Sequence, residues 1–156
     1  MGHRYKLMAL LVCVIAILIL SSAVMHLKAR SNDYVDILTD AFDDNQDIQV
    51  SEIFDFDFER AYVFNDCYIS GDGFASAYGL DLSISEVRPG TSENIHRIVF
   101  VDRNGNLVYE FQYDINQVNF LNEGTIIYPN TRMIKCEPRI AEAITLFFAS
   151  TEFYSD

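Results

Sequence analysis

The sequence predicts an α+β protein in which an N-terminal transmembrane helix precedes a mostly antiparallel sheet with one or two packed helices. A long apolar run lies near the N-terminus, apolar residues at helical spacing follow it, and strand-like alternation fills much of the remaining chain. We expect four parts: a short basic tail (1–6), a transmembrane anchor or signal segment (7–25), a juxtamembrane helix and connection (26–47), and an acidic α+β domain (48–156).

The apolar run, LMALLVCVIAILILSSAVM over residues 7–25, has no charged side chain. About 20 apolar residues in a helix cross the hydrocarbon core of a bilayer. We therefore expect the chain to contact a membrane through this segment. The length of its apolar core favours a retained anchor. The alternative is a signal peptide cleaved after Ala23, since Ser21-Ser22-Ala23 provides small residues for cleavage, and the domain would then be secreted.

Basic residues lie on both sides of this segment, so the positive-inside bias is nearly balanced. Arg4 and Lys6 precede the segment, and Lys28 and Arg30 follow it. A short N-terminal tail with a large C-terminal domain is typical of a signal anchor. We therefore expect a single-pass protein of the cell membrane, with its C-terminal domain outside the cytoplasm.

Charge changes sharply after residue 30. The first 30 residues contain four Lys and Arg and no acid, whereas the rest contains all 23 acids and seven Lys and Arg, a formal charge of −16. Phosphate backbones and anionic lipid headgroups would repel such a domain, which argues against nucleic-acid binding. The charge keeps the domain soluble, and it would also attract a protein partner with a basic surface.

The juxtamembrane segment predicts a helix over residues 31–45, because Tyr34, Leu38 and Phe42 recur at helical spacing. From Ile53 the period changes to two. Phenylalanines at 54, 56 and 58 alternate with acids at 55, 57 and 59, which predicts a strand with one dry and one wet face.

The rest of the domain predicts further strands separated by turns. Asn104-Gly105 is typical of a tight hairpin turn between two β-rich runs. We expect extended runs at 61–64, 80–84, 96–101, 107–113 and 132–135, a helical turn at 74–78 stopped by Gly79, a second hairpin from 118–121 through 122–124 to 126–128, and a C-terminal strand at 143–149.

The run Phe58-Glu59-Arg60-Ala61-Tyr62-Val63-Phe64, followed by Tyr68, resembles a motif of small extracytoplasmic proteins of Gram-positive bacteria, which are often lipoproteins. Their pattern is roughly Trp-Asp-x-x-Tyr-Val-Phe, so this chain has Phe58 and Glu59 where Trp and Asp are usual. It also lacks the lipid-bearing cysteine. The resemblance covers about residues 53–149 and implies an extracytoplasmic, sheet-rich domain. It implies no catalytic residues.

Candidate chemistry is sparse. The sequence contains no nucleophile elbow and no phosphate-binding glycine loop, and we expect no catalytic residue, cofactor or metal site. A calcium loop starting at Asp43 fails, because Ile48 stands where glycine is needed and Phe54 where glutamate is needed. A surface hydrolase would use carboxylates or Cys67 with His96. Outside the cytoplasm, Cys67 and Cys136 would either form a disulfide or remain buried thiols.

Binding is the leading functional prediction. Tyrosines combine an apolar ring with a polar tip and are enriched at interfaces. We expect the candidate binding surface to contain Tyr62, Tyr68, Tyr109 and Tyr113. The chain would then be a membrane-tethered, non-enzymatic binding or accessory domain outside the cytoplasm. The alternatives are a cell-surface hydrolase and an anchored immunity-type inhibitor of a basic partner.

Overall fold

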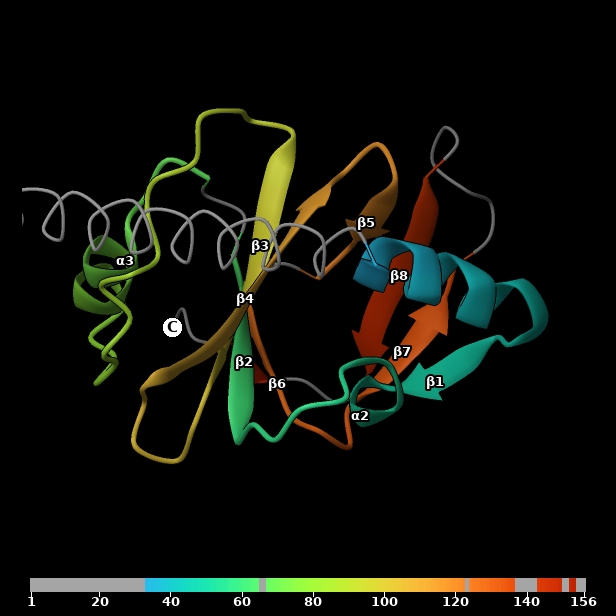
Figure 1. Ribbon diagram of the computed structural model, residues 1–156, viewed down its shortest axis with the longest axis horizontal. Coiled ribbons are helices and arrows are strands. Elements are labelled where there is room, and N and C mark those ends of the chain that lie inside the picture. The colour runs from blue at the N-terminus through green and yellow to red at the C-terminus, as the bar shows by residue number, and fades with distance from the viewer. Residues whose placement is uncertain (1–32, 65–66, 123, 137–142, 150–151, 154–156) are drawn as a thin grey trace, which may run out of the picture. The chain divides into compact units, whose positions relative to one another are not determined.

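The computed structural model describes residues 33–156, except 65–66, 123, 137–142, 150–151 and 154–156 (Figure 1). Tyr34–Asp156 form one compact unit. The predicted membrane segment, residues 7–25, lies outside the described residues. Among the residues that are described, no helix is both long enough and apolar enough to cross a bilayer.

The strands of the described residues form two sheets. Sheet A contains, in spatial order, β1 (Asp47–Gln49), β7 (Arg132–Lys135), β8 (Ile144–Ala149) and β5 (Val118–Phe120). Sheet B contains β4 (Leu107–Asp114), β3 (Ile95–Val101), β2 (Arg60–Phe64), β6 (Thr125–Ile127) and β9 (Glu152–Phe153). All these pairs are antiparallel except β5 with β8. The mostly antiparallel α+β class is confirmed, but its strands are divided between two sheets.

Three helical segments of the described chain accompany the sheets. Residues 33–44 form a helix, and its residues Tyr34, Leu38 and Phe42 are buried. This confirms the predicted helix over residues 33–44 of its expected range, 31–45. The others are α2 (Val50–Ile53) and α3 (Gly71–Ala77). Ser70 caps α3, since its hydroxyl accepts a hydrogen bond from the Gly73 amide at 3.1 Å.

The alternating phenylalanine segment is not a strand, which corrects the prediction. Residues 54–59 belong to no strand, and only the Glu59 amide bonds a neighbouring strand among the described residues, at the Val101 carbonyl of β3 (2.9 Å), although the burial of the segment alternates as expected. Phe54 is fully buried, Phe56 and Phe58 pack against the same core, and the acid that follows each phenylalanine is exposed. The alternation of phenylalanines and acids therefore indicates a segment with one buried and one solvent-exposed side. It does not require a partner strand.

The predicted second hairpin is also wrong, because its two strands lie in different sheets. β5 pairs with β8, whereas β6 pairs with β2. Two residues of the predicted turn, Asn122 and Gly124, form hydrogen bonds with other strands. The Asn122 side chain exchanges hydrogen bonds with the backbone of Phe148 at 2.7 and 2.8 Å, and the Gly124 amide donates to the Val63 carbonyl at 3.1 Å. The segment crosses between the sheets.

Sheet B has an apolar cluster on each face, because successive side chains of a strand point to opposite sides. Ile98 and Phe100 join the larger cluster, which includes the helix of residues 33–44 and the inner residues of sheet A. Val99 and Val101 join a smaller cluster with Phe74 of α3. In Figure 1, α3 and the helix of residues 33–44 lie near different sheets.

Candidate functional site

The exposed face of the helix of residues 33–44 is strongly acidic. Residues three and four apart share one face of a helix. The acidic face consists of Asp33, Asp36, Asp40, Asp43 and Asp44, all of them exposed. The buried side chains of this helix lie on the opposite side, so packing alone accounts for the apolar face and leaves the acidic one facing solvent.

Two of these aspartates stand where the helix disfavours them. Asp43 and Asp44 occupy the last turn, at the negative end of the helix dipole, where an acid costs about 0.3–1 kcal/mol. A lysine partly offsets this charge, since the Lys135 ammonium of β7 donates to the Phe42 carbonyl at 2.7 Å. Asn45 bonds the Ala41 carbonyl at 2.8 Å. The two acids thus persist against the local preference of the helix.

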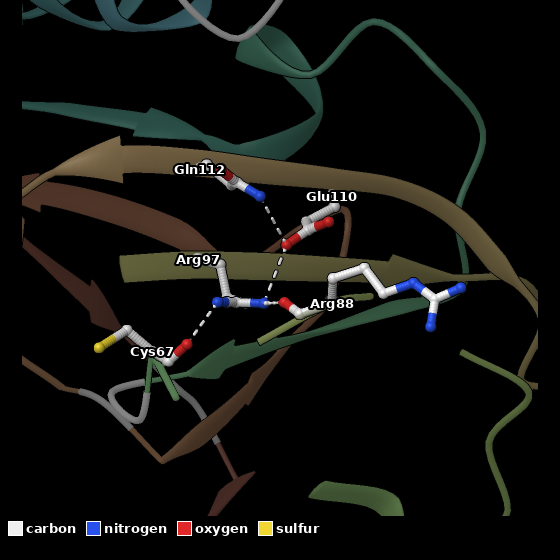
Figure 2. A network of polar contacts seen from close by, with 5 residues as sticks. All are labelled: Cys67, Arg88, Arg97, Glu110 and Gln112. Carbon is white, nitrogen blue, oxygen red and sulfur yellow. Dashed lines mark hydrogen bonds and ion pairs between the residues drawn. The ribbon is translucent and has the colours of Figure 1, made fainter. Parts of the chain in front are cut away.

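A second polar feature is a buried arginine in sheet B (Figure 2). The Arg97 side chain donates to the carbonyls of Cys67 and Arg88, at 2.7 and 2.6 Å, and to the Glu110 carboxylate at 3.2 Å. Gln112 donates to the same carboxylate at 3.0 Å. The Arg97 side chain is 1% exposed and that of Glu110 is 18% exposed. The charge is therefore paired and hydrogen-bonded, as a buried cation requires.

Arg97 ties two loops to the sheet and to each other. The Gly90 amide also donates to the Cys67 carbonyl, at 2.5 Å. A Cβ at Gly90 would lie 2.7 Å from that carbonyl and 2.8 Å from Arg97 Nη2, so the close approach needs glycine. The network holds in place the chain next to Tyr68, which is 60% exposed.

The predicted tyrosine surface is largely wrong. Tyr62, Tyr109 and Tyr113 are buried, and of the four only Tyr68 is exposed. The three buried tyrosines point into the two apolar clusters, where neighbouring side chains cover their rings. Burial raises the pKa of Tyr62, and the neighbouring Arg60 only partly opposes this effect.

The cysteines and the histidine considered for chemistry lie apart. Both Cys67, which is buried, and Cys136, which is half-buried, are free thiols in the structure. They follow strands of different sheets, β2 and β7. Cys67 lies on the Arg97 side of sheet B, whereas the His96 ring packs near Tyr113, on the other side. The fold does not join Cys67 and His96 as a nucleophile and base.

Carboxylates of the described residues do not converge on a metal site. No group of three or more His, Cys, Asp or Glu among them is placed to hold a metal ion. Asp55, Asp57 and Glu59 are exposed along the irregular segment after α2. Asp55 instead accepts a hydrogen bond from the Tyr34 hydroxyl at 2.5 Å, which joins that segment to the helix.

Sequence reasoning missed the role of Arg97. The available signal was a charged residue within the apolar run Arg97-Ile98-Val99-Phe100-Val101. Alternation places Arg97 on the same face as Val99 and Val101, both of which are buried. A cation there must find partners from other segments, and only the fold identifies the Cys67 and Arg88 carbonyls.

No family model matches this chain, and no curated protein or solved structure matches it.

Proposed function

We propose that this chain is a membrane-tethered, extracytoplasmic binding domain without catalytic activity, and that its partner is a protein with a basic surface. Residues 7–25 would provide the tether and the acidic face of the helix the attraction. The observation that carries the proposal is that face, with five exposed aspartates on one side of a single helix. Clustered charge of one sign raises the rate at which a partner of opposite charge associates.

The basic side chains of the domain offer little compensation. Of the seven Lys and Arg after residue 30, Arg97 is buried, Arg132 is paired with Asp47 and Lys135 bonds the helix end. The acids at the last turn of the helix support the same conclusion, because residues that oppose local stability are characteristic of functional surfaces.

The topology is tested by protease treatment of intact cells that produce the full chain. Loss of the domain, detected with an antibody against its C-terminus, is the expected result. Controls are lysed cells and a cytoplasmic protein that must survive in intact ones. A domain protected until lysis would contradict the extracytoplasmic location.

The partner class is tested by affinity capture from the native membranes at low and high salt. We expect capture of a basic protein that is released as salt rises. Replacing Asp36, Asp40 and Asp43 with Asn should weaken the capture about tenfold, since three of the charges that attract the partner are removed. A matched variant replaces three other exposed acids, Asp81, Glu86 and Glu93, with their amides and should retain binding. Equal loss in both variants would refute a role for the helix face.

A second candidate is an anchored immunity-type inhibitor that neutralises a basic toxin. The same acidic face favours it. It differs in location, since such an inhibitor would face the cytoplasm. Protection from external protease together with capture of a basic toxin would support this alternative over the first.

A further inference from the structure

The face of sheet A that points away from the helix of residues 33–44 carries exposed apolar side chains. Ile134 of β7 and Phe147 of β8 are directly paired across the sheet. Their neighbours Met133 and Phe148 are fully buried in the core that includes the helix. Because successive side chains alternate, Ile134 and Phe147 lie on the opposite, outer face.

Leu121 extends this feature to a third strand. Phe120 pairs with Leu146 in the parallel β5–β8 ladder, and the Leu121 amide donates to the Leu146 carbonyl at 2.9 Å. One further residue in this register places Leu121 beside Phe147. Leu121 is 47% exposed and Phe147 41% exposed, and Ile134 is half-buried. We call Leu121, Phe147 and Ile134 the apolar row. None of the three belongs to either core cluster of the described residues.

Polar side chains border the apolar row. Asp47 of β1 pairs with Ile134 at one end and forms an ion pair with Arg132, on the same face. Asn119 of β5 lies two residues before Leu121 and is half-buried. An apolar centre with a polar border is the arrangement found at protein interfaces, where a few central side chains supply most of the binding energy.

We propose that the apolar row is the surface on which a basic partner protein docks, with an apolar side chain of the partner packed between Leu121 and Phe147. The proposal rests on the proposed function and adds an apolar contact on the face of sheet A that points away from the helix of residues 33–44, so the acidic helix face attracts the partner from outside this contact. Three side chains make a small centre, so the interface is of the weak, transient class.

Charge identifies the occupant. The chain after residue 30 has a formal charge of −16. A second copy would carry the same charge, and an anionic lipid surface would also be repelled. A partner protein with basic residues around an apolar side chain suits this surface. The negative field of the domain attracts its basic residues, and the apolar row packs against its apolar side chain.

The test is an NMR titration of the isotope-labelled full chain in micelles of a non-ionic detergent. The probe is the peptide Ac-Lys-Leu-Lys-Leu-Lys-amide. Two matched peptides are titrated in parallel, one with Glu in place of Lys and one with Ser in place of Leu. Phe147→Ser is the test variant and Val108→Ser the control, since Val108 is a 38% exposed apolar residue on sheet B.

We expect the largest shifts at Leu121, Ile134 and Phe147, with the Lys/Leu peptide only. Phe147→Ser should raise the Kd about tenfold, as loss of a central aromatic contact does, and Val108→Ser should leave it unchanged. The spectra also report whether each variant is folded, and Leu121→Ser replaces Phe147→Ser if that variant is not.

Each other outcome overturns the proposal in a distinguishable way. Shifts confined to the acidic helix face, or equal binding of the Lys/Ser peptide at the apolar row, would refute apolar docking on this row. Either outcome would leave the proposed function standing. Row binding by the Glu/Leu peptide would refute the charge argument. Absence of shifts with the Lys/Leu peptide would count against both the apolar row and the basic-partner function.

Discussion

Arg97 reaches Glu110 diagonally across β3 and β4, with 3.2 Å between Nη1 and Oε1. In the register of the two strands, Arg97 pairs with Gln112 and Glu110 pairs with Val99. Such diagonal neighbours are within reach of long side chains. The contact gives the buried guanidinium its only carboxylate partner among the described residues. The Arg88 and Cys67 carbonyls accept from Nη1 and Nη2, whereas the buried Nε has no hydrogen-bond partner in the described structure.

Removal of that carboxylate should destabilise the domain. Glu110→Ala leaves the Arg97 charge buried without an ionic partner, which costs about 3–5 kcal/mol when the pair is fully buried. Because Glu110 is partly exposed, we expect about 2–3 kcal/mol by urea denaturation. Exposed Glu93→Ala is the control, with an expected change below about 0.5 kcal/mol. Equal effects of the two variants would contradict the role of the network.

Gly71 should tolerate no side chain. A Cβ there would lie 2.0 Å from the Ile84 carbonyl oxygen, and the Gly71 amide already bonds the Val87 carbonyl at 2.9 Å. We expect Gly71→Ala to lower the unfolding free energy by about 2 kcal/mol or more. In the same helix, the Cβ of Gly73→Ala would meet side-chain atoms only, the nearest being Ile69 Cγ1 at 3.0 Å and Ser70 Oγ at 3.2 Å. It should change stability by less than about 1 kcal/mol. Similar losses at both positions would refute this difference.

The hairpin turn should lower the pKa of Asp102. The Asn106 side chain and amide, and the Asn104 amide, donate to its carboxylate and favour the charged form, so the pKa lies below 3.8. A depressed folded pKa adds stability above the unfolded value of 3.8, and this stability is lost as the pH falls through the folded pKa. NMR titration should show a higher pKa for Asp102 in Asn106→Ala. An unchanged value would contradict the assignment.

The two domain cysteines should differ in reactivity. Cys67 is 4% exposed and Cys136 is half-buried, and both are free thiols. In a Cys13→Ser variant prepared without reductant, a maleimide should modify Cys136 quickly in the native state and both thiols after denaturation. Mass spectrometry of the adducts provides the measurement. Denatured protein that takes no label until reduced would instead demonstrate the Cys67–Cys136 disulfide.

Neutralising the acids at the end of the helix should stabilise the protein. Asp43→Asn and Asp44→Asn each remove a negative charge from the C-terminal end of the helix dipole, and each should add about 0.3–1 kcal/mol. The measurement is thermal or urea unfolding at low salt. Asp57→Asn, outside the helix, is the control and should change little. A loss of stability in the two helix variants would show that the acids serve the fold itself.

Local patterns predicted many elements correctly, because local chemistry determines them. Helical spacing located the helix of residues 33–44, and Asn104-Gly105 located the β3–β4 hairpin. Gly105 has a φ of 79°, the positive value such a turn requires. The C-terminal strand, β8, was also predicted, from its β-branched and aromatic residues.

Errors arose where the outcome depended on distant partners. The alternation of Phe54, Phe56 and Phe58 correctly predicted which side chains pack inward, but not whether a neighbouring strand would pair with them. The predicted tyrosine surface failed for the same reason. Tyr109 and Tyr113 alternate on β4 as a surface row would, and only the helix and the second sheet cover them.

The sequence by itself determined the uncharged apolar segment of residues 7–25, the step to a charge of −16 after residue 30, and the local helix and hairpin. These depend on composition or on residues a few positions apart. Only the tertiary structure decided the division into two sheets, the partners of Arg97 and the exposure of Phe147 beside Ile134. Such features depend on segments that are remote in the chain and meet on folding, and burial and hydrogen bonding select among pairings that local spacing leaves equivalent.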